Sequence, residues 1–435
     1  MKDVSTQHSG VFKVDEYKLS DQMTIEKFRL QNGLKVIILE DHSAPVFAYH
    51  TWFNVGSRNE RDGITGIAHL FEHLMFKETK NTKEGEFDRI LEEQGGKINA
   101  GTYLDWTFYR ESVPKEAFSL IPPLEADRMA NMILSEKQIN AEREVVANER
   151  RFRVDNSPDG QMQEALYKNA FTVHPYHWPI IGWMKDIQSI SVQDCITFYK
   201  TYYAPNNATI VVVGDVMTQD VLSAINKSYS HIPSSVVPAE DIPSEPSQEK
   251  ERLVTLELTI PEEKILIGYK VPDLLNPSFN VMSVINGILF DGHSSRLYRK
   301  LVADSSMASE ASGSLDHTKD PGLYTIQVSM NDGIAADKAL TIIDEEIEKL
   351  KVEKVTQEEL ERAVNRVETS FWASFGTADE KAQNLGFYET AAKDFKKVFM
   401  EVELLRKVTP NNVIEAAKTY LQTSKRTIVR AKPKQ

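Results

Sequence analysis

The stretch His69-Leu70-Phe71-Glu72-His73 places two imidazoles and a carboxylate within five residues of the chain. On a helix, residues i and i+4 share a face and i+3 is their neighbour, so both rings and the Glu72 carboxylate can address one space. Imidazole pairs suit Zn²⁺, and a carboxylate beside an activated water is what metal-assisted hydrolysis requires. The order H-x-x-E-H, the reverse of the commoner H-E-x-x-H, therefore predicts a zinc-binding helix.

The alternative is a helix that carries two histidines by chance. Five apolar residues surround the motif: Ile67, Leu70, Phe71, Leu74 and Met75. They predict that the helix is buried, where two histidines and a glutamate would be costly without a partner. A metal ion is the partner that accounts for all three side chains.

A catalytic zinc has three protein ligands and one open position, so a third ligand is expected. The best candidates lie on a helix that a capping pair, Ser135 and Gln138, predicts to begin at Ser135. Glu142 and Glu149 are two turns apart on that helix and share one face. Spacing alone leaves open that this face is merely solvated.

These motifs, with several others in the same order, resemble the pitrilysin/insulinase family of inverzincin zinc metallopeptidases, which includes the mitochondrial processing peptidase. The further matches are Val55–Glu60, Gly95–Thr102, Asp105, Thr107, His174–Tyr176, Tyr202–Asn207 and Val211–Val216. The resemblance covers nearly the whole chain. It implies that Glu149 is the third zinc ligand, that Glu142 supports catalysis, and that one Zn²⁺ is bound per chain.

The resemblance and the order of elements predict an α+β fold of two homologous halves, each a mainly antiparallel sheet covered by helices. Strands are expected at Lys35–Glu40, Val46–Phe53, Ile98–Arg110 and Thr209–Val213, and helices at 115–154, 160–171 and Ser191–Tyr203. In the second half, strands are expected at Leu253–Ile260, Ile265–Val271, Leu323–Val328 and Arg426–Arg430, and helices up to Ile288 and at 335–351, 357–373 and 410–422.

A segment rich in proline, serine and acidic residues divides the chain near its middle. We predict a catalytic zinc-binding domain at 1–232, a semi-extended linker at 233–250 and a second homologous domain at 251–435.

Composition limits the function further. A net charge of −13 argues against nucleic acid as a partner and mildly favours basic or neutral peptides. One cysteine, Cys195, excludes intrachain disulfides and is expected to be a small buried apolar residue. No apolar run is long enough to span a membrane, and residues 1–10 lack the apolar stretch of a signal peptide. A cytoplasmic location is expected for the sequence as given, with export as the alternative.

The predicted chemistry assigns His69, His73 and Glu149 to zinc and makes Glu72 the general base. His174 and His177 are competing ligand candidates, but the H-P-Y loop of the family is structural. The resemblance also implies that Asn99-Ala100-Gly101-Thr102 is an edge strand that pairs with an extended peptide substrate. The alternative is an ordinary internal strand, which Gly101 would weaken.

The second half departs from the family pattern. Self-sufficient members carry an Arg and a Tyr seven residues apart after an S-R-L segment, which here is Ser295-Arg296-Leu297. The two positions are Val302 and Ser309, which cannot stabilise an oxyanion as Arg and Tyr do. The resemblance therefore predicts the zinc-bearing subunit of a heterodimer whose second, homologous chain supplies the Arg/Tyr pair. A weakly active homodimer and a non-catalytic scaffold subunit are the alternatives.

Overall fold

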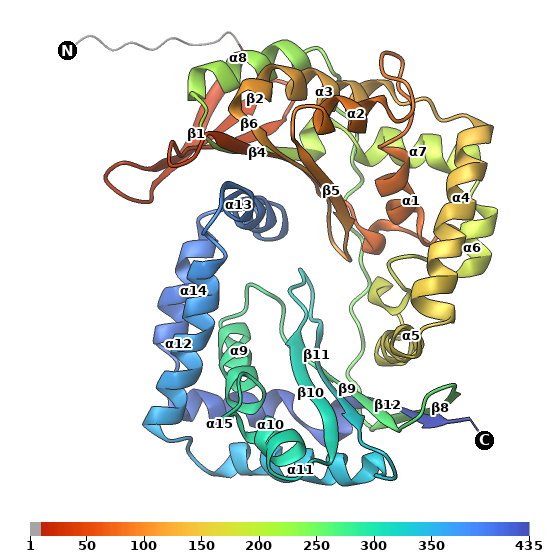
Figure 1. Ribbon diagram of the computed structural model, residues 1–435, viewed down its shortest axis with the longest axis vertical. Coiled ribbons are helices and arrows are strands. Elements are labelled where there is room, and N and C mark those ends of the chain that lie inside the picture. The colour runs from red at the N-terminus through yellow and green to blue at the C-terminus, as the bar shows by residue number, and fades with distance from the viewer. Residues whose placement is uncertain (1–9, 435) are drawn as a thin grey trace. The chain divides into compact units, whose positions relative to one another are not determined.

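The computed structural model describes residues 10–434 and contains two mixed sheets with flanking helices (Figure 1). The first sheet has seven strands in the order β1-β2-β3-β7-β4-β6-β5. Their bounds are β1 Val11–Lys18, β2 Thr24–Leu30, β3 Lys35–Glu40, β4 Val46–Phe53, β5 Lys97–Thr102, β6 Thr107–Pro114 and β7 Ala208–Gly214. Only β3 and β7 pair in parallel, so the sheet is mainly antiparallel, as predicted.

The second sheet has five strands in the order β10-β11-β9-β12-β8. Their bounds are β8 Arg252–Leu258, β9 Lys264–Lys270, β10 Ala308–Leu315, β11 Leu323–Met330 and β12 Arg426–Pro433. Only β8 and β12 pair in parallel. Read from β8, this order repeats β3-β7-β4-β6-β5 of the first sheet strand for strand, with the parallel pair in the same place. The predicted fold of two related halves is confirmed.

The helices follow the same repeated plan. Those of the first half are α1 Ile67–Leu74, α2 Glu86–Glu92, α3 Ile121–Asn131, α4 Glu136–Arg150, α5 Pro158–Ala170, α6 Met184–Ser189, α7 Val192–Tyr202 and α8 Thr218–Tyr229. Those of the second half are α9 Ser278–Leu289, α10 Arg296–Tyr298, α11 Ala336–Val352, α12 Gln357–Ala373, α13 Ala378–Ala392, α14 Lys397–Arg406 and α15 Pro410–Tyr420. In each half the first long helix follows the sheet's central antiparallel strand, β4 or β9.

Two sequence predictions were wrong in detail. The single strand expected at Ile98–Arg110 is a hairpin of β5 and β6, because the chain turns where Tyr103 donates a backbone hydrogen bond to Trp106. The long helical segment expected at 115–154 is divided between a 3-10 turn, α3 and α4, with a break at Met132, which forms a β-bridge with Thr79. Extended backbone at Met132 cannot continue a helix.

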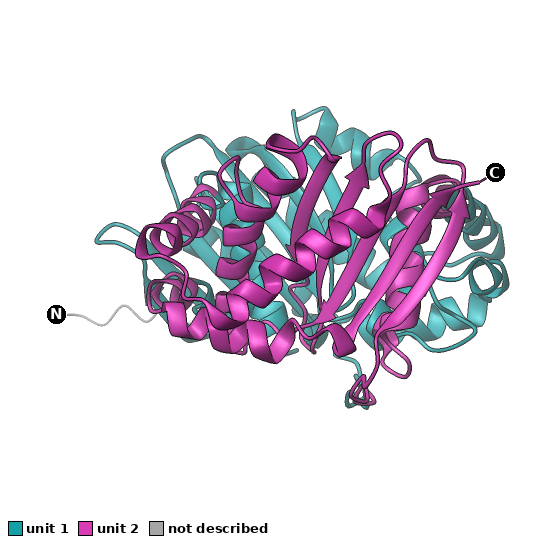
Figure 2. Ribbon diagram, turned by 90° about the horizontal axis from the view of Figure 1, so that it is seen from below, with its two compact units in different colours: residues 1–148, 180–241, 374–398 teal, residues 149–179, 242–373, 399–435 magenta. Residues whose placement is uncertain are grey.

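Each half lends one helix to the compact unit built on the other half's sheet. One unit comprises residues 1–148, 180–241 and 374–398, and the other comprises 149–179, 242–373 and 399–435 (Figure 2). In the first unit α13 packs on β4 and β7, and in the second α5 packs on β9 and β12. The two helices therefore hold corresponding places on corresponding strands. The domain boundaries expected at residues 232 and 251 divide the chain in sequence, and they remain a prediction.

The linker at 233–250 contains no helix or strand, but it is held by hydrogen bonds. The Glu245 carboxylate accepts backbone N–H donors from Thr172, Val173 and His174, and Gln248 donates to the carbonyl of Arg426. The prediction about a signal peptide rests on residues outside the described range. Among the described residues, no helix combines the length and apolar character needed to cross a bilayer.

Candidate metal centre

Helix α1 is fixed at its start by a buried carboxylate. Glu60 accepts backbone hydrogen bonds from Gly66 at 2.8 Å and from Ala68 at 2.9 Å. Gly66, the N-cap residue, has no side chain that could accept these hydrogen bonds. It adopts φ +89°, and a Cβ at this position would lie 2.4 Å from the Ile181 carbonyl oxygen. Glu60 thus satisfies two N–H groups that the first turn leaves open. Sequence analysis found Glu60 only as part of a motif and missed this capping role.

The apolar face of α1 is buried, as the sequence predicted. Ile67, Leu70, Phe71 and Leu74 are almost fully buried, and the Phe71 ring stacks on Tyr199 and Tyr203. This packing fixes the rotation of the helix about its axis. His69 is therefore buried at 8% exposure, while Glu72 and His73 are half-buried at the edge of a groove.

Helix α4 brings the third predicted ligand to the two histidines. Its start matches the prediction, since the Ser135 hydroxyl accepts a hydrogen bond from the Gln138 backbone N–H. The helix runs unbroken to Arg150, and ligand atoms of His69, His73 and Glu149 all lie within 4.8 Å of one another. Among residues 10–434 this is the one cluster of three or more such side chains that could hold a metal ion. His174 and His177 are not part of it.

Glu142 lies behind His73 rather than in the ligand cluster. Its carboxylate is 3.6 Å from Nδ1 of His73 and 2.8 Å from the Lys77 ammonium. Burial raises the pKa of Glu142, but hydrogen bonding to His73 and Lys77 outweighs burial and leaves the pKa below its usual value. A carboxylate on one ring nitrogen orients the imidazole and leaves the other nitrogen for a metal. The alternative of a merely solvated face is excluded for Glu142, which is 5% exposed.

The donor set fits a catalytic zinc. Two imidazoles and one carboxylate are the ligands of a known class of hydrolytic zinc sites, which keep a fourth position open. The ligand atoms already lie close together, and the outer carboxylate that such sites use to orient a histidine is present in Glu142. Glu149 also pairs with Arg153 at 3.0 Å, which compensates the negative charge of the Glu149 carboxylate.

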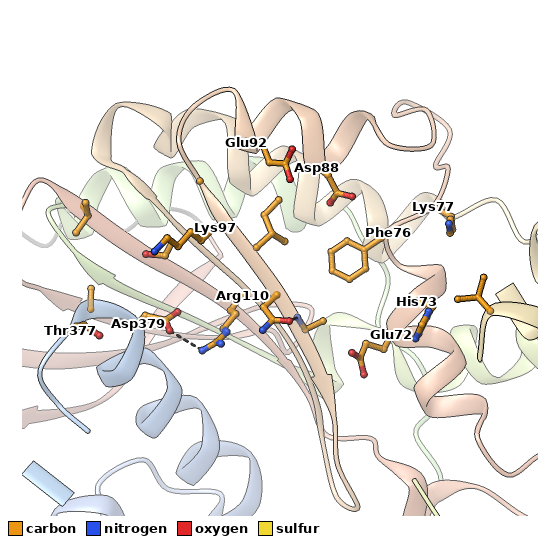
Figure 3. Close-up of a pocket in the computed structure, with 18 of the residues that line it drawn as sticks. Glu72, His73, Phe76, Lys77, Asp88, Glu92, Lys97, Arg110, Thr377 and Asp379 are labelled. Atoms are coloured by element: carbon orange, nitrogen blue, oxygen red, sulfur yellow. Dashed lines mark hydrogen bonds and ion pairs between the residues drawn. The ribbon is translucent and has the colours of Figure 1, made fainter. Parts of the chain in front are cut away.

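A groove of about 1230 Å³ runs beside the cluster (Figure 3). Glu72, His73 and Glu142 line it together with Gly96 to Ala100, at the start of β5. Strand β5 is the edge of the seven-stranded sheet and pairs only with β6 among the described strands. The internal-strand alternative for Asn99-Ala100-Gly101-Thr102 is therefore wrong. Gly101 is needed because a Cβ there would lie 2.9 Å from the Phe108 ring.

The opposite wall of the groove comes from a helix that the sequence analysis did not predict. Thr377, Ala378 and Asp379 at the start of α13 line the groove, and Asp379 forms an ion pair with Arg110 at 2.9 Å (Figure 3). The buried His50 ring also contacts Asp379 at 2.9 Å. These contacts join residues more than 260 positions apart, and no local sequence signal reports them.

The remaining predicted residues lie elsewhere. Val302 packs against the core of the second half, and Ser309 is exposed on the edge strand β10. His174 accepts a hydrogen bond from the Tyr176 backbone N–H and contacts Asp320, which is a structural arrangement. Cys195 is fully buried, and burial raises the pKa of its thiol to about 12. Cys195 is therefore the small buried apolar residue that was predicted, and its thiol is unreactive.

Comparison with known proteins decides the family. Residues 35–182 match the family model described as Insulinase (Peptidase family M16), and residues 189–367 match Peptidase M16 inactive domain. The chain is also 31% identical to the zinc protease PqqE of Helicobacter pylori over 417 residues, which cover 94% of this chain and 93% of that protein. The chain belongs to peptidase family M16.

Further similar proteins agree with this assignment. The crystal structure of a protease from Helicobacter pylori superimposes with a TM-score of 0.89 at 32% identity and covers 94% of this chain and 99% of that one. The probable mitochondrial-processing peptidase subunit beta of Arabidopsis thaliana is 29% identical over 205 residues, which cover 47% of this chain and 38% of that protein. The chain is thus a half-length M16 protein, and its relatives include zinc proteases.

Proposed function

We propose that this chain is a zinc-dependent endopeptidase that cleaves unfolded or extended peptides. The observation that carries the proposal is the convergence of His69, His73 and Glu149 beside Glu72, at a groove bordered by a free sheet edge. The M16 family membership and the zinc proteases among the relatives support it.

In this proposal His69, His73 and Glu149 hold one Zn²⁺ per chain. The metal supplies charge for polarising the scissile carbonyl and lowers the pKa of water. The Glu72 carboxylate removes the proton from the attacking water and later delivers it to the leaving amine nitrogen. Glu142 holds the His73 ring through Nδ1 and so positions a ligand without touching the substrate.

The substrate is proposed to add as a strand to β5. The backbone of Asn99 to Thr102 offers hydrogen-bonding groups along the sheet edge, and Asn99 and Ala100 line the groove next to Glu72. Main-chain pairing gives affinity for any extended peptide with little dependence on sequence. Folded proteins would be excluded because they cannot present a free strand.

We further propose that the chain works as the zinc-bearing subunit of a heterodimer that closes a chamber around the peptide. Val302 and Ser309 stand where the family has Arg and Tyr, so a homologous second chain would supply that pair. A non-catalytic scaffold subunit is the second candidate, because part of the chain matches the model named for an inactive domain. The complete donor set and Glu72 favour the peptidase.

The test is metal analysis joined to peptide hydrolysis. Purified protein should contain about one zinc per chain after reconstitution, as three ligands and an open site require. A His69→Ala, Glu149→Ala double variant should lose the zinc, whereas Glu144→Gln, an exposed change on the same helix, should keep it. Absence of zinc from the reconstituted protein, or full zinc in the double variant, would refute the ligand assignment.

A further inference from the structure

Lys77 continues the row of side chains that begins with the two histidines of the metal cluster. His69, His73 and Lys77 follow one another at intervals of four residues, a spacing that places side chains on one face of a helix. Helix α1 ends at Leu74, but the chain adds one further turn, in which the Lys77 backbone N–H donates to the Leu74 carbonyl at 2.9 Å. Lys77 and His73 therefore both line the groove (Figure 3).

The Lys77 ammonium binds the carboxylate that faces His73. Its Nζ lies 2.8 Å from Oε1 of Glu142, while Oε2 of the same carboxylate lies 3.6 Å from Nδ1 of His73. The two oxygens of Glu142 thus have different partners. An ion pair at Oε1 restricts rotation of the carboxylate, so it keeps Oε2 directed at the imidazole.

Burial distinguishes this ion pair from an ordinary salt bridge on the surface. The Glu142 side chain is 7% exposed and the Lys77 side chain 24% exposed, so water screens the two charges less than it does at the surface. Burial lowers the pKa of Lys77, but hydrogen bonds to Glu142 and Glu84 outweigh burial and raise the pKa. Lys77 is therefore positively charged at neutral pH.

The second carboxylate partner of Lys77 offers a comparison within the same contact. Glu84 lies just before α2, with Oε1 at 3.1 Å from the Lys77 Nζ, and its side chain is 61% exposed. Exposed ion pairs contribute little, because water screens them and the side chains lose freedom. The two partners of Lys77 therefore differ in burial and in what they touch, since only the buried one faces His73.

The orientation of Glu142 matters because a histidine that binds a metal needs its second ring nitrogen held. A carboxylate at Nδ1 favours the proton on that nitrogen and leaves Nε2 free as a metal ligand. A Glu142 carboxylate that lacked its cation would be a largely buried charge with less compensation, free to turn away from the ring. The group that fixes Glu142 therefore also fixes the His73 imidazole.

We propose that Lys77 is a positioning residue of the metal centre: it fixes the Glu142 carboxylate, which in turn holds the His73 ring in place as a ligand. This inference rests on the proposed function, in which His73 binds zinc. In this role Lys77 touches neither the metal nor the substrate. A different role, in which Lys77 only binds the peptide in the groove, would leave the zinc affinity unchanged when Lys77 is replaced.

The test is the zinc affinity of the purified full chain, measured by competition with a chromogenic chelator at pH 7. Loss of an outer partner of a metal ligand typically lowers metal affinity by about 10- to 100-fold, and we expect a loss of about tenfold for Lys77→Met. Lys77→Gln is a second variant that should show the same loss. Lys77→Arg keeps the charge and should bind zinc nearly as the wild type does. Glu84→Gln removes only the exposed partner and should leave the affinity unchanged.

A double-mutant cycle shows whether Lys77 acts through Glu142. Glu142→Gln alone should lower zinc affinity by about 10- to 100-fold. Adding Lys77→Met to it should cause no further loss, because residues that act through one shared contact have non-additive effects. Cooperative thermal unfolding of each metal-free variant shows that it is folded.

The possible results separate this inference from the proposed function. Absence of zinc binding by the wild type would overturn both. Zinc binding by the wild type with equal affinity in Lys77→Met and Lys77→Gln would overturn only the positioning role. The positioning role would also be overturned if the losses of Lys77→Met and Glu142→Gln multiplied in the double variant, because Lys77 would then act on the metal centre by a route that does not include Glu142.

Discussion

The two halves of this chain share one order of strands, but the corresponding pair of helices carries different residues in each half. In the first half α1 carries His69 and His73 toward Glu149 on α4. In the second half the corresponding helices are α9 and α12, which meet through small residues, since a Cβ on Gly287 would lie 3.2 Å from the Ala363 Cβ. Helix α9 contains no histidine or acidic residue.

The difference shows which features the repeated fold requires in both halves and which features can vary between them. Both halves need an apolar helix face against the sheet, and Ile67, Phe71, Met282 and Ile285 meet that need with full burial. The space between the helices is not set by the sheet. It can hold a cluster of two histidines and a glutamate, as between α1 and α4, or close on a glycine, as between α9 and α12.

The largest expected effect comes from removing the proposed general base, Glu72, from the first half. Glu72→Gln keeps the size of the side chain and removes its ability to take a proton, so peptide hydrolysis should fall by about 10²- to 10⁴-fold. Zinc content should stay at the wild-type level, because Glu72 is not a proposed ligand. Glu144→Gln on α4 is the matched control and should hydrolyse peptides normally. Loss of zinc together with activity would make Glu72 a ligand instead.

The second prediction concerns the Arg/Tyr pair that the second half lacks. Each missing oxyanion donor typically costs about a hundred- to a thousandfold in rate, so the isolated chain should be nearly inactive on unfolded peptides. Adding a homologous chain that carries the Arg/Tyr pair should restore hydrolysis, measured as kcat/KM. Val302→Arg with Ser309→Tyr should recover part of the activity.

Val302 packs against the apolar core, so the double variant must first be shown to fold by circular dichroism. Complementation by the second chain does not depend on that variant and tests the same idea. Full activity of a rigorously purified single chain would refute the heterodimer and imply that other residues of this chain hold the substrate.

The third prediction compares the two exchanged helices. Gly386 of α13 faces the buried Trp52 indole, and a Cβ would lie 2.1 Å from its Nε1, so Gly386→Ala should cost about 2–3 kcal/mol of stability despite the better helix propensity of alanine. Gly268 of β9 faces the flexible end of Leu166 on α5 at 3.0 Å, and Gly268→Ala should cost less than about 1 kcal/mol. Urea denaturation measures both, and equal losses would show that Trp52 can move.

The smallest expected effect concerns the linker between the halves. Burial raises the pKa of Glu245, but backbone N–H donors from Thr172, Val173 and His174 outweigh it and lower the pKa to about 2. A lowered pKa means that the carboxylate stabilises the fold above its unfolded value near 4.3. This stability is lost as pH falls from about 4 toward 2.

Glu245→Gln should therefore reduce the free energy of unfolding by about 1 kcal/mol at pH 7. The difference from wild type should shrink as the pH approaches 2, followed by denaturation at a series of pH values. A difference that is constant with pH would show that the hydrogen bonds, and not the charge, stabilise the linker.

Strands β3 and β4 were predicted residue for residue, because they are runs rich in β-branched residues in β3 and in aromatic residues in β4. The helix expected at Ser191–Tyr203 begins where it was predicted, since Ser191 and Asp194 form a capping box at the start of α7. Strand β10 was not predicted, since Ala308–Leu315 contains serine and glycine and has exposed positions on both faces. The β5–β6 turn was also missed, because the alternation typical of a strand continues through it.

The sequence by itself determined the H-x-x-E-H motif and the family. Spacing on one helix is a local property, so His69, Glu72 and His73 could be placed on one face from the helical repeat alone. The pairing of Glu142 and Glu149 on a single face followed from the same repeat. The resemblance then assigned each its role.

Only the tertiary structure decided what surrounds that motif. The ion pair of Asp379 with Arg110 and the contact of the buried His50 ring with the same Asp379 both depend on segments that are distant in the sequence. The packing of α13 on the first sheet brings these segments together. Such contacts leave no periodic trace in the sequence, because the free energy that selects them comes from burying surfaces that are far apart along the chain.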